Sequence, residues 1–278
     1  MKPQLLIDGK DARALYGLSV SAGSYKDLAC LPKLKDIAYN DRHEKNGIDP
    51  DLSSPVVDAE DIAMEFFIVG DISLYNSLID VLSNGAYHTF TFNEIGITKT
   101  LRLVKCGNVR SIQELHKFSL TFCDDNPMVG YEYESASSDI IPMYDYAIDS
   151  KDLSEYGIRI LQGTLDSIKK APDVKENLKV NIQSVNGQHY DGEKVVYKSK
   201  SVDLYCLMRA RSLDEFWRNR NALLHDLIQP GSRTLSVAAI NKEIPFYYKS
   251  CSVQSFYPDD GKAWFEFTLS IEFFEGVI

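Results

Sequence analysis

The chain carries one succession of short motifs twice, and this repeat constrains the fold more than any other feature. The segment IDGKDARALYGLSV begins at Ile7, and IDSKDLSEYGIRI begins at Ile148, so that Tyr16-Gly17 returns as Tyr156-Gly157, 140 residues later. A proline, a Val-Val strand, a helical segment, a cysteine and a closing aromatic strand also recur in the same order. Six landmarks in one order predict two copies of one domain, a tandem duplication.

The predicted boundaries follow from the closing motif of the first copy. FCDDNP ends at Pro127, and a short polar stretch with YESASSD follows, as is typical of a linker. We therefore predict a first copy at 1–127, a linker at 128–141 and a second copy at 142–278. Each copy is within the usual size of a domain and can bury one core.

Hydrophobic periodicity predicts a mainly β fold with one helix per domain (α+β), as two β-sandwich or barrel-like units. Residues 72–82 have a helical stripe of apolar side chains, and Asp71 or Ser73 can cap its start. The second helix is predicted after Ser212, whose spacing to Glu215 is that of a capping box. The final strand alternates from Phe265 to Phe273, with one buried face.

Each copy also contains a long polar excursion before its central strand, at 38–55 and at 181–194. A loop of this length in a compact domain is usually functional or disordered, and both copies keep it. We expect the two loops to make contacts with other chains. The candidate interface residues are Tyr39, His43, Asn46, His189, Tyr190, Asp191 and Trp217.

Composition excludes several function classes. The net charge of −10 disfavours direct nucleic-acid binding, and no apolar run approaches the ~20 residues of a membrane span. The N-terminal residues show no hydrophobic signal segment, so cytoplasmic synthesis is expected. The five cysteines are odd in number and lack a CxxC pair, which predicts reduced, structural thiols.

No catalytic motif is found, and the five histidines are scattered, with His88 and His116 expected to face water. The carboxylates between residues 49 and 61 lack the spacing of a calcium loop and the cover that would raise a pKa. We predict no enzyme activity, no cofactor and no metal site.

With these elements in order, the repeated unit resembles a known family. The IDG strand at Ile7, the Tyr16-Gly17 turn, the Leu78, Ile79 and Leu82 stripe, and the Phe118 to Pro127 ending match the ring-forming N-terminal domain of distal tail proteins of long-tailed phages. More broadly, they resemble the tail-tube and baseplate-hub fold. The resemblance covers the first 127 residues. The second copy shows it more loosely, because its closing FFEG lacks the D-x-P ending.

The resemblance implies a structural protein of a phage or prophage tail, made in the cytoplasm and incorporated into the virion tail. It implies partners among tube and tail-tip proteins. Two tube-type domains in one chain imply a pseudo-six-fold ring, most simply a trimer, because closed rings satisfy sheet edges. The alternatives left open are a carbohydrate- or receptor-binding β-sandwich, another assembly or adaptor module and, least favoured, a polysaccharide-active enzyme.

Overall fold

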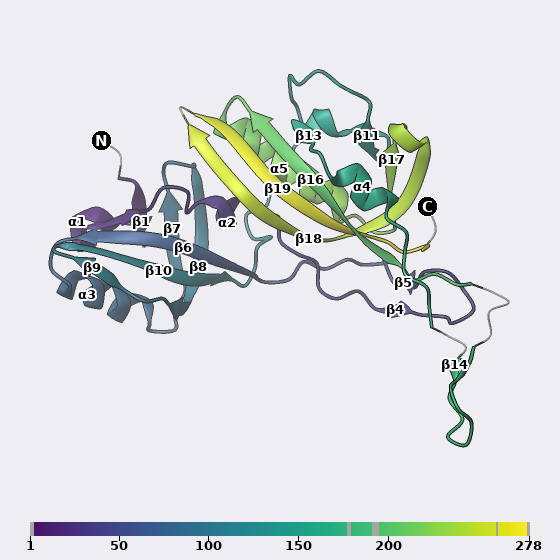
Figure 1. Ribbon diagram of the computed structural model, residues 1–278. Coiled ribbons are helices and arrows are strands. Elements are labelled where there is room, and N and C mark those ends of the chain that lie inside the picture. The colour runs from purple at the N-terminus through teal and green to yellow at the C-terminus, as the bar shows by residue number, and fades with distance from the viewer. Residues whose placement is uncertain (1–2, 177–178, 191–194, 260, 277–278) are drawn as a thin grey trace.

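The computed structural model describes residues 3–176, 179–190, 195–259 and 261–276, which form two twisted antiparallel sheets placed side by side (Figure 1). The mainly β architecture with few helices confirms the predicted fold class. The first sheet contains β1 (Leu5–Ile7), β2 (Lys10–Asp11), β3 (Leu18–Val20), β6 (Glu60–Val69), β7 (His88–Phe92), β8 (Ile97–Cys106), β9 (Arg110–Ile112) and β10 (Leu115–Asp124). The second contains β11 (Tyr146–Ile148), β12 (Lys151–Asp152), β13 (Ile158–Ile160), β16 (Lys200–Ala210), β17 (Arg233–Val237), β18 (Lys242–Asp259) and β19 (Lys262–Phe273).

Helices and two short hairpins complete the described chain. The helical elements are α1 (Ala12–Tyr16), α2 (Lys26–Ala29), α3 (Ser73–Leu82), η1 (Leu153–Tyr156), α4 (Thr164–Lys169), α5 (Leu213–Leu227) and η2 (Ala238–Ile240). The hairpins pair β4 (Tyr39–Asn40) with β5 (Asp49–Pro50), and β14 (Lys179–Val180) with β15 (His189–Tyr190).

The two sheets have the same topology. The first follows the order β2-β1-β7-β8-β10-β6-β3, and the second follows β12-β11-β17-β18-β19-β16-β13, so each strand has a counterpart at the same place. Even an irregularity recurs: β8 and β10 shift register between Thr121 and Phe122, and β18 and β19 shift between Tyr248 and Ser250. This shared topology agrees with the sequence repeat. The duplication event and the boundaries at 127 and 141 stay predictions.

The repeated Tyr-Gly pair has a specific structural role in both sheets. Gly17 and Gly157 end α1 and η1 in the left-handed conformation, with φ of 63° and 76°. A Cβ on Gly17 would lie 2.5 Å from the Val69 carbonyl oxygen, and one on Gly157 would lie 2.6 Å from the Arg209 carbonyl oxygen. Only glycine combines this backbone conformation with so close an approach to the adjacent strand.

The helix signals in the sequence are largely correct. Asp71 Oδ1 accepts the backbone N–H of Ser73 at 2.8 Å, at the start of α3. Ser212 Oγ accepts the N–H of Glu215 at 3.0 Å, while Glu215 Oε2 accepts the N–H of Arg211 rather than that of Ser212. The capping box of α5 is thus confirmed in a form displaced by one residue.

The expectation that His88 and His116 face water is wrong, because both side chains are buried. His88 Nδ1 lies 2.7 Å from Asp8 Oδ2, and His116 lies within hydrogen-bonding distance of Ser111 Oγ and of the Gly70 carbonyl oxygen. The partners come from turns beside the strands, and they satisfy polar atoms that alternation alone places on an outer face.

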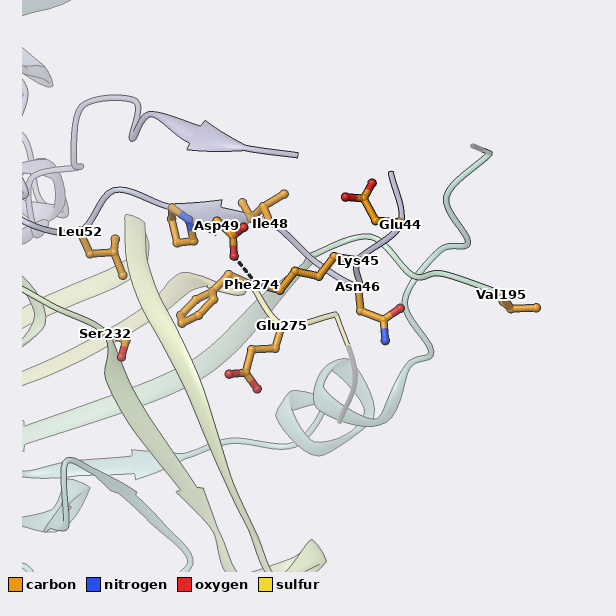
Figure 2. A pocket seen from close by; sticks show the side chains of 11 residues that line it. Glu44, Lys45, Asn46, Ile48, Asp49, Leu52, Val195, Ser232, Phe274 and Glu275 are labelled. Carbon is orange, nitrogen blue, oxygen red and sulfur yellow. Dashed lines mark hydrogen bonds and ion pairs between the residues drawn. The ribbon is translucent and has the colours of Figure 1, made fainter. Parts of the chain in front are cut away.

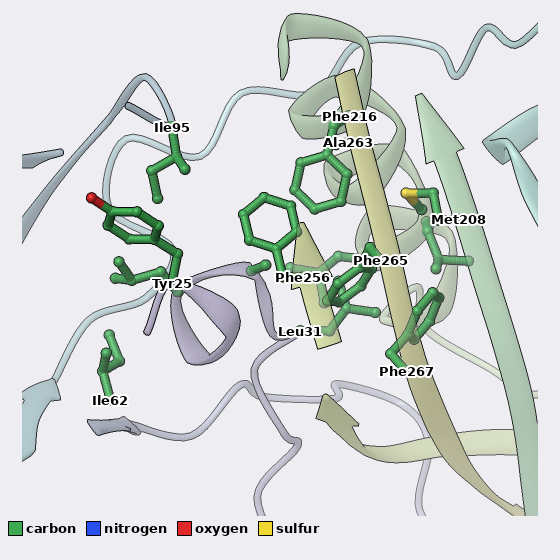
Figure 3. Close-up of a cluster of buried hydrophobic side chains, with 14 of the residues drawn as sticks. Tyr25, Leu31, Ile62, Ile95, Met208, Phe216, Phe256, Ala263, Phe265 and Phe267 are labelled. Atoms are coloured by element: carbon green, nitrogen blue, oxygen red, sulfur yellow. The ribbon is translucent and has the colours of Figure 1, made fainter. Parts of the chain in front are cut away.

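The buried apolar side chains of both halves form one continuous cluster (Figure 3). Helix α2 of the first half packs against β18 of the second sheet, and Leu31, which follows α2, is 1% exposed. Trp217 of α5 donates its indole N–H to the carbonyl oxygen of Ile95 at 2.7 Å. The segment predicted as a linker packs along α5, where Ser137 and Asn219 exchange two hydrogen bonds. The halves therefore share a core.

Candidate functional site

The most distinctive surface feature is a pair of equivalent extended segments. We call residues 33–58 the first arm and residues 173–198 the second arm; each carries one of the two short hairpins. An isolated bridge closes each base, between Leu34 and Val57 in the first arm and between Val174 and Tyr197 in the second. The described parts of the two arms correspond residue for residue at a constant separation of 140.

The internal hydrogen bonds of the arms are also equivalent. At the base, the N–H of Lys35 donates to the carbonyl oxygen of Val56 at 2.8 Å, and the N–H of Lys175 donates to that of Val196 at 2.7 Å. At the tip, the Lys45 N–H donates to the Arg42 carbonyl oxygen at 3.2 Å, as the Val185 N–H does to that of Ile182 at 3.0 Å. Both arms therefore have the same backbone form.

The first arm docks on the second half of its own chain. The N–H of Leu34 donates to the Lys249 carbonyl oxygen at 2.9 Å, at the bulge of β18. The N–H of Gly47 donates to the Tyr197 carbonyl oxygen at 2.8 Å, and Asn46 Oδ1 accepts the N–H of Tyr197 at 2.9 Å. The arm thus extends the backbone pairing of the second half.

A buried lysine anchors the tip of the first arm. Lys175, at the base of the second arm, is 6% exposed, and its ammonium group lies 2.5 to 3.0 Å from four oxygen atoms. These are Oδ1 of Asp41 and the carbonyl oxygens of Arg42, Lys45 and Gly47. A buried ammonium group is tolerated only when oxygen atoms replace its water, so this cage fixes the tip of one arm to the base of the next.

The second arm has no such neighbour within the described part of the chain. Figure 1 shows β14 and its loop projecting away from both sheets, whereas β4 and β5 run beneath the second sheet. The described residues at its tip, 181–189, are all exposed. A Cβ added to Gly187 would meet no described atom within 4 Å, whereas one added to Gly47 would collide with the Phe274 carbonyl oxygen.

A groove of about 740 Å³ lies between the first arm and the end of the second sheet (Figure 2). Its wall includes Glu44, Asp49, Phe274 and Glu275. Hydrogen bonding to Lys45 is the main cause that holds the pKa of the Asp49 carboxyl below its usual range. A carboxylate of that kind is ionised at neutral pH, whereas a general acid needs a raised pKa. The groove offers packing surface and ion pairs rather than acid–base chemistry.

The predicted interface residues fall into two groups. Asn46 and Trp217 make their contacts within the chain, at the junction of the two halves. Tyr39 and His43 are exposed on the first arm, and His189 is exposed on the second. Tyr190 belongs to β15, and Asp191 lies outside the described residues. Their contact with other chains stays a prediction.

Sequence reasoning missed the residue that anchors the docked arm. Lys175 stands in a polar stretch and gives no sign of burial, although its constant separation from Lys35 marks it as an arm-base position. Within the described ranges, no three His, Cys, Asp or Glu side chains gather as they would around a metal ion. In the same part of the chain, no helix has the length and apolar character needed to cross a membrane.

Comparisons with known proteins give little. No family model and no curated protein matches the chain. Among solved structures, a protein of the adsorption hub of a phage aligns with 97% of this chain and 97% of its own length. It is the Dit protein (gp 19.1) of SPP1, described as a paradigm of the hub adsorption apparatus in phages that infect Gram-positive hosts. The identity is 9% and the TM-score 0.33, a likeness that establishes neither fold nor function.

Proposed function

We propose that this chain is a structural protein of a phage or prophage tail, a distal-tail or baseplate-hub-like component that assembles into a pseudo-six-fold ring. The simplest such ring is a trimer, in which each chain supplies two equivalent units. Its partners are further copies of itself and the tube and tail-tip proteins above and below it. The chain has no catalytic task in this proposal and works by contact alone.

One observation carries the proposal: a single topology occurs twice in the chain, side by side, and an arm of the first unit is docked on the second. Units that meet head to tail through unlike surfaces form a closed ring when the rotation between them closes. The family resemblance of the first 127 residues, given by the IDG strand, the Tyr-Gly turn and the aromatic closing strand, supports the same function.

The oligomeric state and the particle shape test this function. Light scattering coupled to size-exclusion chromatography should give a mass about three times that of the 31.4 kDa chain. Negative-stain images of the same fraction should show rings with a central hole and six similar lobes. A chain that stays monomeric at the highest soluble concentration would contradict the proposal. A monomer that binds glycans would favour the carbohydrate-binding alternative instead.

A further inference from the structure

We propose that the second arm docks on the first half of a neighbouring copy of this chain, as the first arm docks on the second half of its own chain. The inference rests on the proposed function in one respect, namely that copies of the chain meet in series. It adds the surfaces that meet and the residues on each side.

The receiving surface is defined by the shared strand register. Leu34 donates to the carbonyl oxygen of Lys249, the residue skipped by the register of β18 against β19. The corresponding donor on the second arm is Val174, and the residue skipped by β8 against β10 is Val104. The N–H of Val174 would therefore donate to the carbonyl oxygen of Val104 in the neighbouring chain.

The lysine cage supplies a second, independent correspondence. The counterpart of Lys175 is Lys35, whose side chain is exposed. The counterparts of the cage atoms are Oδ1 of Asn181 and the carbonyl oxygens of Ile182, Val185 and Gly187. The matching Val185–Ile182 hydrogen bond holds this loop in the caging form. Lys35 of the neighbouring chain completes the cage, and three carbonyl oxygens and an amide oxygen suit an ammonium group.

The backbone at the base of the first arm is also available for pairing. In the docked arm, both the N–H and the carbonyl oxygen of Tyr197 bond to Asn46 and Gly47. The counterpart of Tyr197 is Val57, and no described residue bonds to its N–H or its carbonyl oxygen outside strand pairing. An unpaired extended backbone segment is a site for strand addition, and the second arm has the form to fill it.

Apolar exposure marks the same two surfaces. Leu34 is 8% exposed in the docked first arm, whereas Val174 at the same place in the second arm is 41% exposed. Ile182 and Val185, which replace Arg42 and Lys45 at the tip, are exposed as well. On the receiving side, the uncovered apolar residues are Val56 and Val104. Docking would remove both sets from water, which favours association.

Cross-linking tests the geometry directly. In the docked first arm, the thiol of Cys30 lies 3.4 Å from the carbonyl oxygen of Cys251. The counterparts are Lys170 on the arm side and the native, exposed Cys106 on the receiving side. Mild oxidation of the Lys170→Cys variant should give a ladder of disulfide-linked chains on a non-reducing gel. The matched control, Lys170→Cys combined with Cys106→Ser, should give none.

A charge substitution tests the cage. Lys35→Met should raise the concentration of half-maximal assembly at least tenfold while leaving the thermal unfolding of the single chain unchanged. Lys33→Met, the same change at an exposed position of the same arm, should alter assembly less than twofold. Rings that form normally without the ladder, and that tolerate Lys35→Met, would overturn the docking but not the proposed function. A wild-type chain that never assembles would overturn both.

Discussion

The continuous core predicts that the two halves unfold together, and Leu31→Ala tests this. Leu31 comes from the first half, is 1% exposed and lies in the cluster shared with the second sheet, where Tyr248 donates its hydroxyl to the Leu31 carbonyl oxygen at 3.2 Å. Removing a fully buried leucine side chain costs about 3 kcal/mol. With an unfolding entropy of ~2.1 cal/mol/K per residue, the Tm of a chain this long should fall by about 5 °C.

Two buried thiols allow each half to be followed separately. Cys123 reports on the first sheet and Cys206 on the second, and burial is the main cause that raises the pKa of both. A thiol that is buried and protonated reacts only after unfolding. Under native conditions, Leu31→Ala should therefore accelerate labelling of both cysteines by the same factor, roughly 100-fold for 3 kcal/mol, as measured by mass spectrometry.

The matched control is Leu15→Ala, because Leu15 is 48% exposed in the same half. Its effect on the free energy of unfolding should remain below about 0.5 kcal/mol. If Leu31→Ala accelerates labelling of Cys206 and leaves Cys123 unchanged, or if urea unfolding splits into two transitions, the halves are independent and the reasoning from a shared core fails.

Three further changes test single contacts. Trp217→Phe leaves the buried carbonyl of Ile95 without its donor and should cost about 1 to 2 kcal/mol in urea unfolding; an unchanged midpoint would show that the indole bond is dispensable. Ser212→Ala removes the cap on the N–H of Glu215 and should cost about 1 kcal/mol, with Ser212→Asp restoring most of it. Burial raises the pKa of Glu60 to about 7, above its ordinary value, so its contribution to stability is greatest in acid and is lost as the pH rises towards 7. Glu60→Gln should therefore match the wild type near pH 4.5 and exceed its unfolding free energy by on the order of 2 kcal/mol at pH 8; a constant difference across that range would exclude the titration.

The sequence predicts the parts of the fold that depend on local chemistry. The Tyr-Gly pairs identify glycines that no other residue can replace, and the Ser212 and Glu215 spacing identifies the start of α5. Alternation from Phe265 to Phe273 identifies a strand of which one face is fully buried. In these cases, the residues that decide the structure stand within a few positions of one another.

The parts that sequence reasoning missed depend on distant partners. His116 is buried because a turn at Gly70 supplies its acceptor, and alternation contains no sign of that turn. Asn46 was selected as a candidate for contact between chains, yet it binds Tyr197, 151 positions further along the same chain. The burial of Lys175 depends on four oxygen atoms more than 120 positions away, and no local pattern encodes it.

The docked first arm has a consequence for the order of events in any larger particle. Because the arm and its receiving surface belong to one polypeptide, their effective concentration is of the order of millimolar, far above that of separate chains in a cell. The junction inside each chain therefore forms first, and the chain enters assembly as a rigid doublet. A six-lobed particle then needs three encounters of preformed pairs, and incomplete rings with an odd number of lobes do not arise.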